Sequence, residues 1–166
     1  MIRYVRGDLL QADTEAVVNA VNTVGVMGKG IALAFKQIYP ANFAEYEASC
    51  RARQVRTGCM FVTENRVPHH PRWIINFPTK RHWRQPSRLE WIEEGLADLR
   101  RVILDRKIRS VAIPPLGCGL GGLDWEQVRP TIAGALDELQ DVDVRVYEPV
   151  AERAVGGAVP ELVVLR

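Results

Sequence analysis

Two glycine-rich segments carry the clearest chemical signal in this sequence. The first is Gly25-Val26-Met27-Gly28-Lys29-Gly30, and the second is Gly117-Cys118-Gly119-Leu120-Gly121-Gly122. Each follows a stretch typical of a strand and precedes a stretch typical of a helix. Glycines let a backbone approach a ligand closely, and the first N–H groups of a helix attract phosphate. Two such segments in one small domain favour a ligand with two phosphates over ordinary turns.

Two familiar classes of nucleotide-binding protein do not fit this pattern. The second segment matches G-x-G-x-x-G, and Asp143 lies about 20 residues further on, where a dinucleotide-binding fold places its ribose-binding acid. That motif belongs in the first strand–helix turn, however, and only one predicted strand follows it here. No G-x-x-x-x-G-K-[ST] sequence occurs, so no hydroxyl is placed for magnesium as in nucleoside triphosphatases. A diphosphate bound without an obvious metal remains.

The segment 66–88 is strongly basic. It contains six Lys and Arg residues and no acid, together with all three histidines and two of the four tryptophans. Residues 51–109 hold 14 Lys and Arg against 6 Asp and Glu, a net charge of +8, although the whole chain carries only +2. Basic residues interleaved with aromatic ones can follow a phosphate backbone and stack on bases. A solvated surface is the alternative interpretation.

Alternating strands and helices position these segments. β-Branched stretches predict strands at Ile2–Arg6, Ala16–Val21, Met60–Glu64, Arg72–Phe77, Ser110–Pro114 and Val142–Tyr147. Helices are predicted at Ile31–Tyr39, at Asn42–Arg53, after a Ser87-Arg88-Leu89-Glu90 capping box, and at Asp124–Leu139. Pro130 should kink the last helix or mark its real start. This alternation predicts the α/β class with a largely parallel sheet, in which ligands bind at the carboxyl ends of the strands.

The composition is that of one ordinary globular domain. The chain has 166 residues, of which 47% are apolar and 25% charged, as in soluble proteins. Its three cysteines form no C-x-x-C pair, which disfavours a zinc ribbon or a disulfide framework. The start lacks an apolar signal-peptide core, and the longest uncharged run, Val111–Leu123, contains two prolines and four glycines. We therefore expect a cytoplasmic protein without a membrane span, with a domain at 1–150 and a tail, or the start of a further region, at 151–166.

Four motifs together resemble a macrodomain, the module that binds ADP-ribose. They are Gly7-Asp8-Leu9, Asn19-Ala20-Val21-Asn22, Gly28-Lys29-Gly30-Ile31-Ala32 and Pro115 to Leu123, in the order of the family. Within that superfamily, Asn76 to Arg84 resembles the macrodomain of the DNA ADP-ribosyl glycohydrolase antitoxins (DarG type), which are related to the terminal ADP-ribose protein glycohydrolases. The resemblance implies a three-layer α/β/α sandwich with a mixed sheet. It also implies removal of ADP-ribose from thymidine in single-stranded DNA, reversing a cognate ADP-ribosyltransferase toxin.

The resemblance also implies the roles of particular residues. Lys80 is expected to be catalytic; it follows a strand end and a proline, and nearby Arg81 and Arg84 favour a lowered pKa of its amine. The residues expected to bind ADP-ribose are Asp8, Leu9, Asn22, Gly28, Lys29, Gly30, Ile31, Gly117, Cys118, Gly119, Leu120 and Tyr147. The residues expected to contact DNA come instead from the basic segment; they are Arg66, Arg72, Arg81, His82, Trp83 and Arg84.

Among these residues, Asp8 is expected to accept a hydrogen bond from the adenine amino group and Asn22 to contact the distal ribose. Each could instead be a residue that forms a local turn. Tyr147 is a weaker candidate for stacking on adenine. We expect Cys118 to be a small residue of the second glycine segment rather than a nucleophile, because no motif pairs it with a histidine. Neither a metal nor a cofactor is expected.

Two other functions stay open at this stage. A non-catalytic reader of ADP-ribose would use the same cavity, but the presence of Lys80 argues against it. A hydrolase of ADP-ribose esters on acidic protein side chains is the second. The protein-directed relatives carry an acid where this sequence has Gly121, which, with the basic segment, argues against that activity. Whether Lys80 acts as a nucleophile or as a proton donor is also open.

Overall fold

The computed structural model describes residues 1–66, 68–69 and 71–150. The segment 151–166, expected to be a tail or the start of a further region, lies outside the described residues. Within them, six strands form one sheet in the order β1-β6-β5-β2-β4-β3. The strands are β1 Ile2–Val5, β2 Ala16–Val21, β3 Phe61–Glu64, β4 Trp73–Pro78, β5 Ser110–Ile113 and β6 Asp143–Tyr147. All neighbours are parallel except β3 and β4, so the mixed, largely parallel sheet is confirmed.

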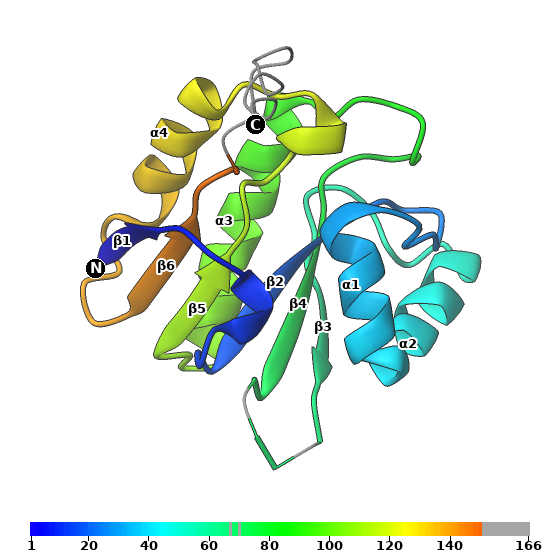
Figure 1. Cartoon of the computed structure of the whole chain (residues 1–166), viewed down its shortest axis with the longest axis horizontal. Helices are drawn as coiled ribbons and strands as arrows, with labels where there is room; N and C mark the ends of the chain where they lie inside the picture. Colours follow the sequence, from blue (N-terminus) through cyan, green and yellow to red (C-terminus); the bar gives the residue numbers. More distant parts are fainter. Residues whose placement is uncertain (67, 70, 151–166) are drawn as a thin grey trace, which may run out of the picture.

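Helices cover both faces of this sheet (Figure 1). They are α1 Gly30–Ile38, α2 Pro40–Arg51, α3 Leu89–Asp105 and α4 Trp125–Leu136, with short 3-10 turns η1 Leu9–Gln11 and η2 Gly119–Gly121. Successive residues of β2 show the layers, because side chains of a strand alternate between faces. Ala16 and Val18 pack with residues of α3 and α4, whereas Val17 packs with Phe35 of α1. The three-layer α/β/α sandwich is therefore confirmed.

Local residue patterns determine most ends of the helices and strands, but two expectations based on such patterns are wrong. Pro40 is the first residue of α2, and Asp124 caps α4 by accepting a hydrogen bond from the Glu126 N–H at 3.0 Å. The last helix was expected from Asp124, with Pro130 either kinking it or marking its real start; α4 begins at Trp125 and runs through Pro130, so the second alternative is wrong. The predicted capping box is also wrong, since α3 is capped by Arg88 without a side-chain hydrogen bond. Ser87 is instead buried against the second glycine segment.

The sheet is open at the point where its two halves meet. β2 and β5 pair only through Ala16–Val111 and Val17–Ala112, although β2 continues to Val21. The chain leaves β2 for α1 on one face and leaves β5 for α4 on the other. Such a divergence creates a crevice at the carboxyl ends of the strands, the usual ligand position in open α/β sheets.

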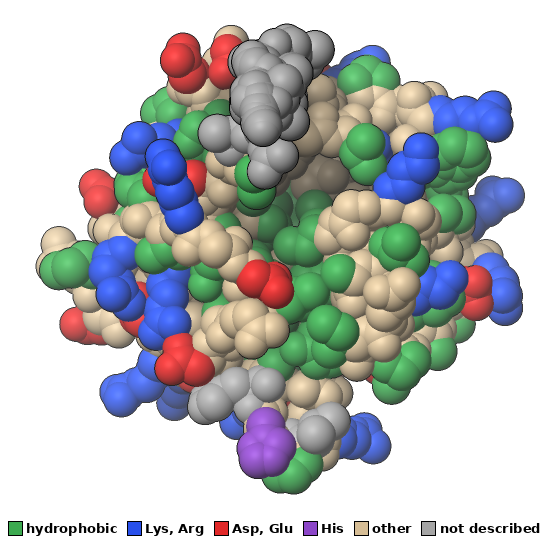
Figure 2. Space-filling model, viewed as in Figure 1, with side chains coloured by type: hydrophobic (Ala, Val, Ile, Leu, Met, Phe, Trp, Pro, Cys, Tyr) green, Lys and Arg blue, Asp and Glu red, His purple; other side chains and the backbone are tan. Residues whose placement is uncertain are grey.

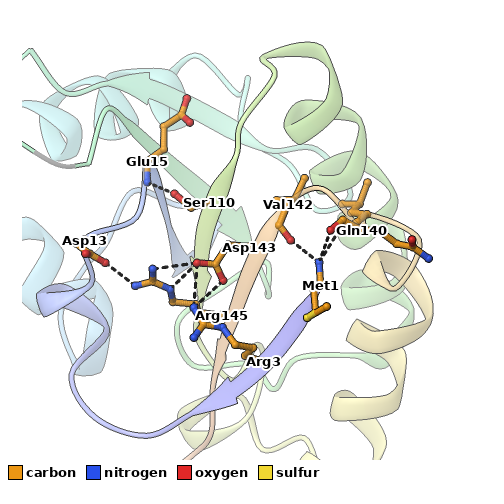
Figure 3. A network of polar contacts seen from close by, with 10 residues as sticks. Met1, Arg3, Asp13, Glu15, Ser110, Gln140, Val142, Asp143 and Arg145 are labelled. Carbon is orange, nitrogen blue, oxygen red and sulfur yellow. Dashed lines mark hydrogen bonds and ion pairs between the residues drawn. The ribbon is translucent and has the colours of Figure 1, made fainter.

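The opposite end of the sheet is held by ionic contacts between strand starts (Figure 3). Asp143 at the start of β6 accepts hydrogen bonds from Arg3 and Arg145, each at 3.0 Å, and Arg145 also pairs with Asp13 at 2.6 Å. Burial alone would raise the pKa of Asp143, but the hydrogen bonds and charges of the two arginines lower it. Asp143 is thus a structural residue, in agreement with the exclusion of a dinucleotide-binding motif.

Candidate functional site

A cavity of about 900 Å³ opens at the carboxyl end of the sheet, between the two glycine segments. Figure 2 shows the molecule hollowed at this end, above a band of hydrophobic side chains. The cavity is lined by Ala20, Val21, Asn22, Val26, Gly28, Lys29, Gly30, Ile31, Ala32, Thr79, Lys80, Trp83, Arg84, Pro114, Pro115, Gly117, Cys118, Gly119, Leu120 and Gly121. Ten of the thirteen residues expected to be catalytic or to bind ADP-ribose are in this set. Asp8, Leu9 and Tyr147 are not.

Asn22 organises the first glycine segment from inside. Its side chain is 5% exposed, its Oδ1 accepts from the Val24 N–H at 3.0 Å, and its Nδ2 donates to the Val26 carbonyl at 2.8 Å. The hydroxyl of buried Tyr46 on α2 donates to Asn22, lying 2.8 Å from Oδ1 and 2.9 Å from the backbone oxygen. The turn-forming role of Asn22 is thus present, and Asn22 is also part of the cavity wall.

The amino-terminal end of α1 faces the cavity. Lys29 is the residue before the first turn and makes no side-chain capping bond, and Gly30 begins the helix with a φ of 59°. Lys29, Gly30, Ile31 and Ala32 all line the cavity. The first N–H groups of a helix carry a partial positive charge, so this end suits a phosphate.

The second glycine segment approaches from the other side. Gly117 and Gly119 have φ values of 73° and 42°, a left-handed backbone that favours glycine. Cys118 between them is buried, and its pKa is raised to about 11 by burial and by the charge of Asp124. A thiol in this state stays protonated at neutral pH, which fits a small packing residue and not a nucleophile.

Lys80 enters the cavity directly after β4. The Thr79 N–H donates to the Val21 carbonyl at 2.8 Å, which continues the β2–β4 pairing up to the lysine. The Lys80 amine donates to the Trp83 carbonyl at 3.2 Å, and burial lowers its pKa. The lowered pKa of Lys80 therefore comes from burial of the amine, and not from the repulsion by neighbouring arginines that the sequence suggested. The charged lining residues are all basic, namely Lys29, Lys80 and Arg84, and no described carboxylate lines the cavity.

The residues expected at the adenine end lie beside the cavity and not in its wall. The exposed Asp8 carboxylate accepts from the Leu10 N–H at 3.0 Å and so caps η1, the local role weighed against adenine binding. Buried Leu9 and Phe35 belong to one hydrophobic cluster, and half-buried Tyr147 and Ile31 pack against this cluster. Ile31 packs against this cluster and also lines the cavity, so the cluster adjoins the cavity.

The basic segment does not form one continuous surface. Arg66 follows β3 and Arg72 precedes β4, and β3 runs antiparallel to β4, so both lie at the hairpin end, far from Lys80 (Figure 1). Arg72 pairs there with Glu64 at 3.3 Å and lies over the Trp73 ring. The structure therefore does not bring these two candidate DNA contacts to the cavity.

The other four candidates lie beside Lys80. Trp83 is 46% exposed and stacks with His82 at 5.2 Å between ring centroids, and the Arg84 guanidinium lies 4.6 Å from the Trp83 ring centroid. Of these, Trp83 and Arg84 line the cavity. Arg81 is directed to the Trp91 ring, 4.8 Å from its centroid, and its Nε donates to Thr57 Oγ1 at 3.4 Å.

Part of the cavity wall comes from residues that were not named as site residues. They are Ala20, Val21, Val26, Ala32, Thr79, Pro114, Pro115 and Gly121. All eight lie at the end of a predicted strand or within one of the motifs. The end of each parallel strand and the whole of each glycine segment were therefore the signals that could have found them.

Comparison with known proteins defines the family. Residues 18–132 match the family described as Macro domain. The chain belongs to the macro domain family. It is 56% identical to the structure titled "Macrodomain of Mycobacterium tuberculosis DarG", with a TM-score of 0.89 over 90% of this chain and 99% of that one. This confirms the resemblance to DarG-type macrodomains.

Two further relatives extend this comparison. A DNA ADP-ribosyl glycohydrolase of Thermus aquaticus is 52% identical over 96% of this chain and 44% of its own length. A Thermosipho africanus DarTG structure in complex with ADP-ribose is 32% identical with a TM-score of 0.86, over 97% of this chain and 43% of that one. The macrodomain thus spans less than half the length of the curated Thermus relative.

No helix in the described part of the chain combines the length and apolarity needed to cross a membrane. Over residues 1–66, 68–69 and 71–150, no group of three or more His, Cys, Asp or Glu residues is placed to hold a metal ion.

Proposed function

We propose that this macrodomain hydrolyses the bond between ADP-ribose and thymine in ADP-ribosylated single-stranded DNA. The observation that carries the proposal is the position of Lys80. Its amine lies in a cavity between two glycine segments suited to a diphosphate, and every charged lining residue described is basic. The relatives named as DNA ADP-ribosyl glycohydrolases support the same reaction, since they share more than half of the residues over most of this chain.

We place ADP-ribose across the cavity with its diphosphate between Gly28–Ile31 and Gly117–Leu120. The adenine then lies toward the cluster of Leu9, Ile31 and Tyr147, within reach of the Asp8 carboxylate. The distal ribose lies toward Asn22 and Lys80, both in the wall. Only one hydrogen of the Asn22 amide is used by the Val26 carbonyl, so the other can contact a ribose hydroxyl.

The chemistry requires little protonation of the leaving group. In both possible routes thymine leaves as an imide-type anion that then takes a proton. In the first, a neutral Lys80 amine attacks the anomeric carbon of the distal ribose as the bond to thymine breaks and loses a proton; in a second step water adds to the same carbon, and the amine leaves and takes a proton back. In the second, water adds directly to the anomeric carbon as the bond to thymine breaks, while a protonated Lys80 donates a hydrogen bond to a thymine carbonyl and stabilises the departing charge. Burial of the amine favours the neutral form.

The DNA strand next to the modified base contacts the rim that carries Lys80. The stacked His82, Trp83 and Arg84 offer a surface on which a base can stack, with Arg81 beside it. Arg66 and Arg72 remain candidates only for a longer strand that reaches the far end of β4. The partner is a cognate cytoplasmic ADP-ribosyltransferase, and one relative is named as a fusion of a DNA ADP-ribosyl transferase and a glycohydrolase.

The test uses two substrates in parallel. The protein is incubated with a thymidine-ADP-ribosylated single-stranded oligonucleotide and with a protein ADP-ribosylated on glutamate, and free ADP-ribose is measured by chromatography. We expect release from the DNA alone. Binding without release from either substrate would identify a reader, and release from the protein alone would identify an ester hydrolase.

A further inference from the structure

Ser87 has an unusual environment beside the cavity. It is 5% exposed, and its N–H donates to the carbonyl of Gly121 at 2.9 Å. Its hydroxyl is buried and has no hydrogen-bond partner among the described residues. A buried hydroxyl without a partner costs stability, so the position of Ser87 calls for a different reason.

The reason lies in the space next to Gly121. The backbone of Gly121 does not have a positive φ, so its conformation does not require glycine. A Cβ atom at this position would lie 2.4 Å from Ser87 Oγ and 3.1 Å from Ser87 Cβ. At Gly117, a Cβ would lie 3.3 Å from Ser87 Cβ. Ser87 therefore occupies space that two glycines of the second segment leave open.

This contact anchors the segment that carries Lys80. Residues 79–88 begin where Thr79 is bonded to Val21, and the Thr23 hydroxyl donates to the Arg81 carbonyl at 2.9 Å. Ser87 attaches the other end of the same segment to the second glycine segment. The Lys80 segment is thus held between the two walls that would hold the diphosphate, and both Lys80 and Gly121 line the cavity.

We propose that Ser87 and Gly121 are a positioning pair for Lys80, a proposal that rests on the hydrolysis proposed above. The absence of a side chain at position 121 lets Ser87 seat the Lys80 segment at a set distance from the diphosphate. Any side chain at 121, a carboxylate included, displaces Ser87 and moves Lys80 relative to the anomeric carbon. A displacement of about 1 Å is enough to slow a positioned reaction by about 100-fold.

The test is a paired substitution with kinetics. Gly121→Ala is expected to lower kcat for ADP-ribose release about 10-fold or more while the Kd for ADP-ribose changes less than about threefold. Ser87→Gly removes the opposing atoms, so Gly121→Ala combined with Ser87→Gly should return to within about threefold of Ser87→Gly alone. Gly134→Ala is the matched control, since a Cβ there on α4 meets no atom within 4 Å. If Gly121→Ala does not fold, Ser87→Thr replaces it as the test. It adds a methyl group to the same contact and should likewise lower kcat while the Kd for ADP-ribose changes little.

A second readout is independent of activity. Trypsin cleaves after Arg81 and Arg84, and a displaced segment is cut faster than a seated one. We expect faster cleavage at these bonds in Gly121→Ala, and wild-type cleavage in the double variant and in Gly134→Ala. A wild-type protein that releases ADP-ribose from neither substrate would refute the proposed function. The rate of trypsin cleavage would still test the Ser87–Gly121 pair in that case. Wild-type kcat in Gly121→Ala, or a double variant as slow or as cleavable as Gly121→Ala, would overturn the positioning pair.

Discussion

At the scale of single residues, Lys80 is the side chain on which the proposed reaction depends. Lys80→Ala removes the amine, which donates to the carbonyl of Trp83, and leaves both glycine segments in place. We expect ADP-ribose release to fall about 100-fold or more. The affinity for ADP-ribose, measured by isothermal titration, should stay within about threefold because the diphosphate contacts remain. Near-wild-type turnover would exclude Lys80 as the catalyst.

The pH dependence separates the two roles of Lys80. Because burial lowers its pKa below the ordinary 10.5, the amine becomes neutral at a lower pH than an exposed lysine. A nucleophile requires the neutral form, so kcat should rise with pH and level off above that lowered pKa. A donor requires the charged form, so kcat should fall over the same range. Lys80→Arg stays charged throughout and should retain activity only if Lys80 is a donor.

Cys118 gives a residue-scale prediction of the opposite kind. With its pKa raised to about 11, its thiol is protonated at pH 7.5. Iodoacetamide should therefore modify the partly exposed Cys59 well before buried Cys118, as read by peptide mass spectrometry. Cys118→Ala should keep release within about threefold, since a packing residue is replaced by a smaller one. Rapid alkylation of Cys118 with loss of turnover would contradict this assignment.

At the scale of the elements, α2 supports the first glycine segment through one hydroxyl. Tyr46→Phe removes the hydrogen bond to Asn22 and should lower the free energy of unfolding by about 1–2 kcal/mol, measured by urea denaturation. The affinity for ADP-ribose should fall because Asn22 holds the turn before α1. Tyr4→Phe on β1, away from the cavity, controls for the loss of a phenol hydroxyl. Unchanged stability and affinity would show that the segment does not depend on α2.

The division of the basic segment between two ends of β4 is also testable. Replacing Trp83 and Arg84 by alanine should weaken binding of modified single-stranded DNA, since a stacked base contributes about 1–3 kcal/mol. The slope of log affinity against log salt should flatten by about 0.7, because Arg84 no longer neutralises one phosphate. Replacing Arg66 and Arg72 by alanine is the control, and it removes two cations where the test pair removes one. We expect it to change the affinity for a short modified oligonucleotide little. Equal weakening of binding by both pairs would mean that the whole segment binds DNA.

At the scale of the whole molecule, the end of the sheet opposite the cavity contributes stability without contributing to the site. Asp143→Asn should lower the free energy of unfolding at pH 7 by about 0.5–1 kcal/mol, a modest value because the network is partly exposed. The folded pKa of Asp143 is lowered, so its stabilisation is present above the ordinary 3.8 and is lost as pH falls below it. The difference in free energy of unfolding between wild type and variant, measured by guanidinium titration, should therefore shrink as the pH is lowered below 3.8. A reduced affinity for ADP-ribose in Asp143→Asn would contradict the separation of the two ends.

Local residue patterns were enough to predict the elements and the ligand-binding end of this protein. All six strands lie within one residue of their predicted ends, because β-branched runs and flanking glycines and prolines are local signals. The two glycine segments and Lys80 could be predicted to meet, since the carboxyl ends of parallel strands share one edge of a sheet.

Contacts between residues far apart in the chain determined the rest. The antiparallel direction of β3 places Arg66 and Arg72 away from Lys80, although all three lie in one basic segment. Ser87 has the sequence of a helix cap but packs against Gly121, and Asn22 is held by a tyrosine 24 residues further along the chain. The order and direction of strands follow from how apolar faces pack through space, which local residue patterns do not encode.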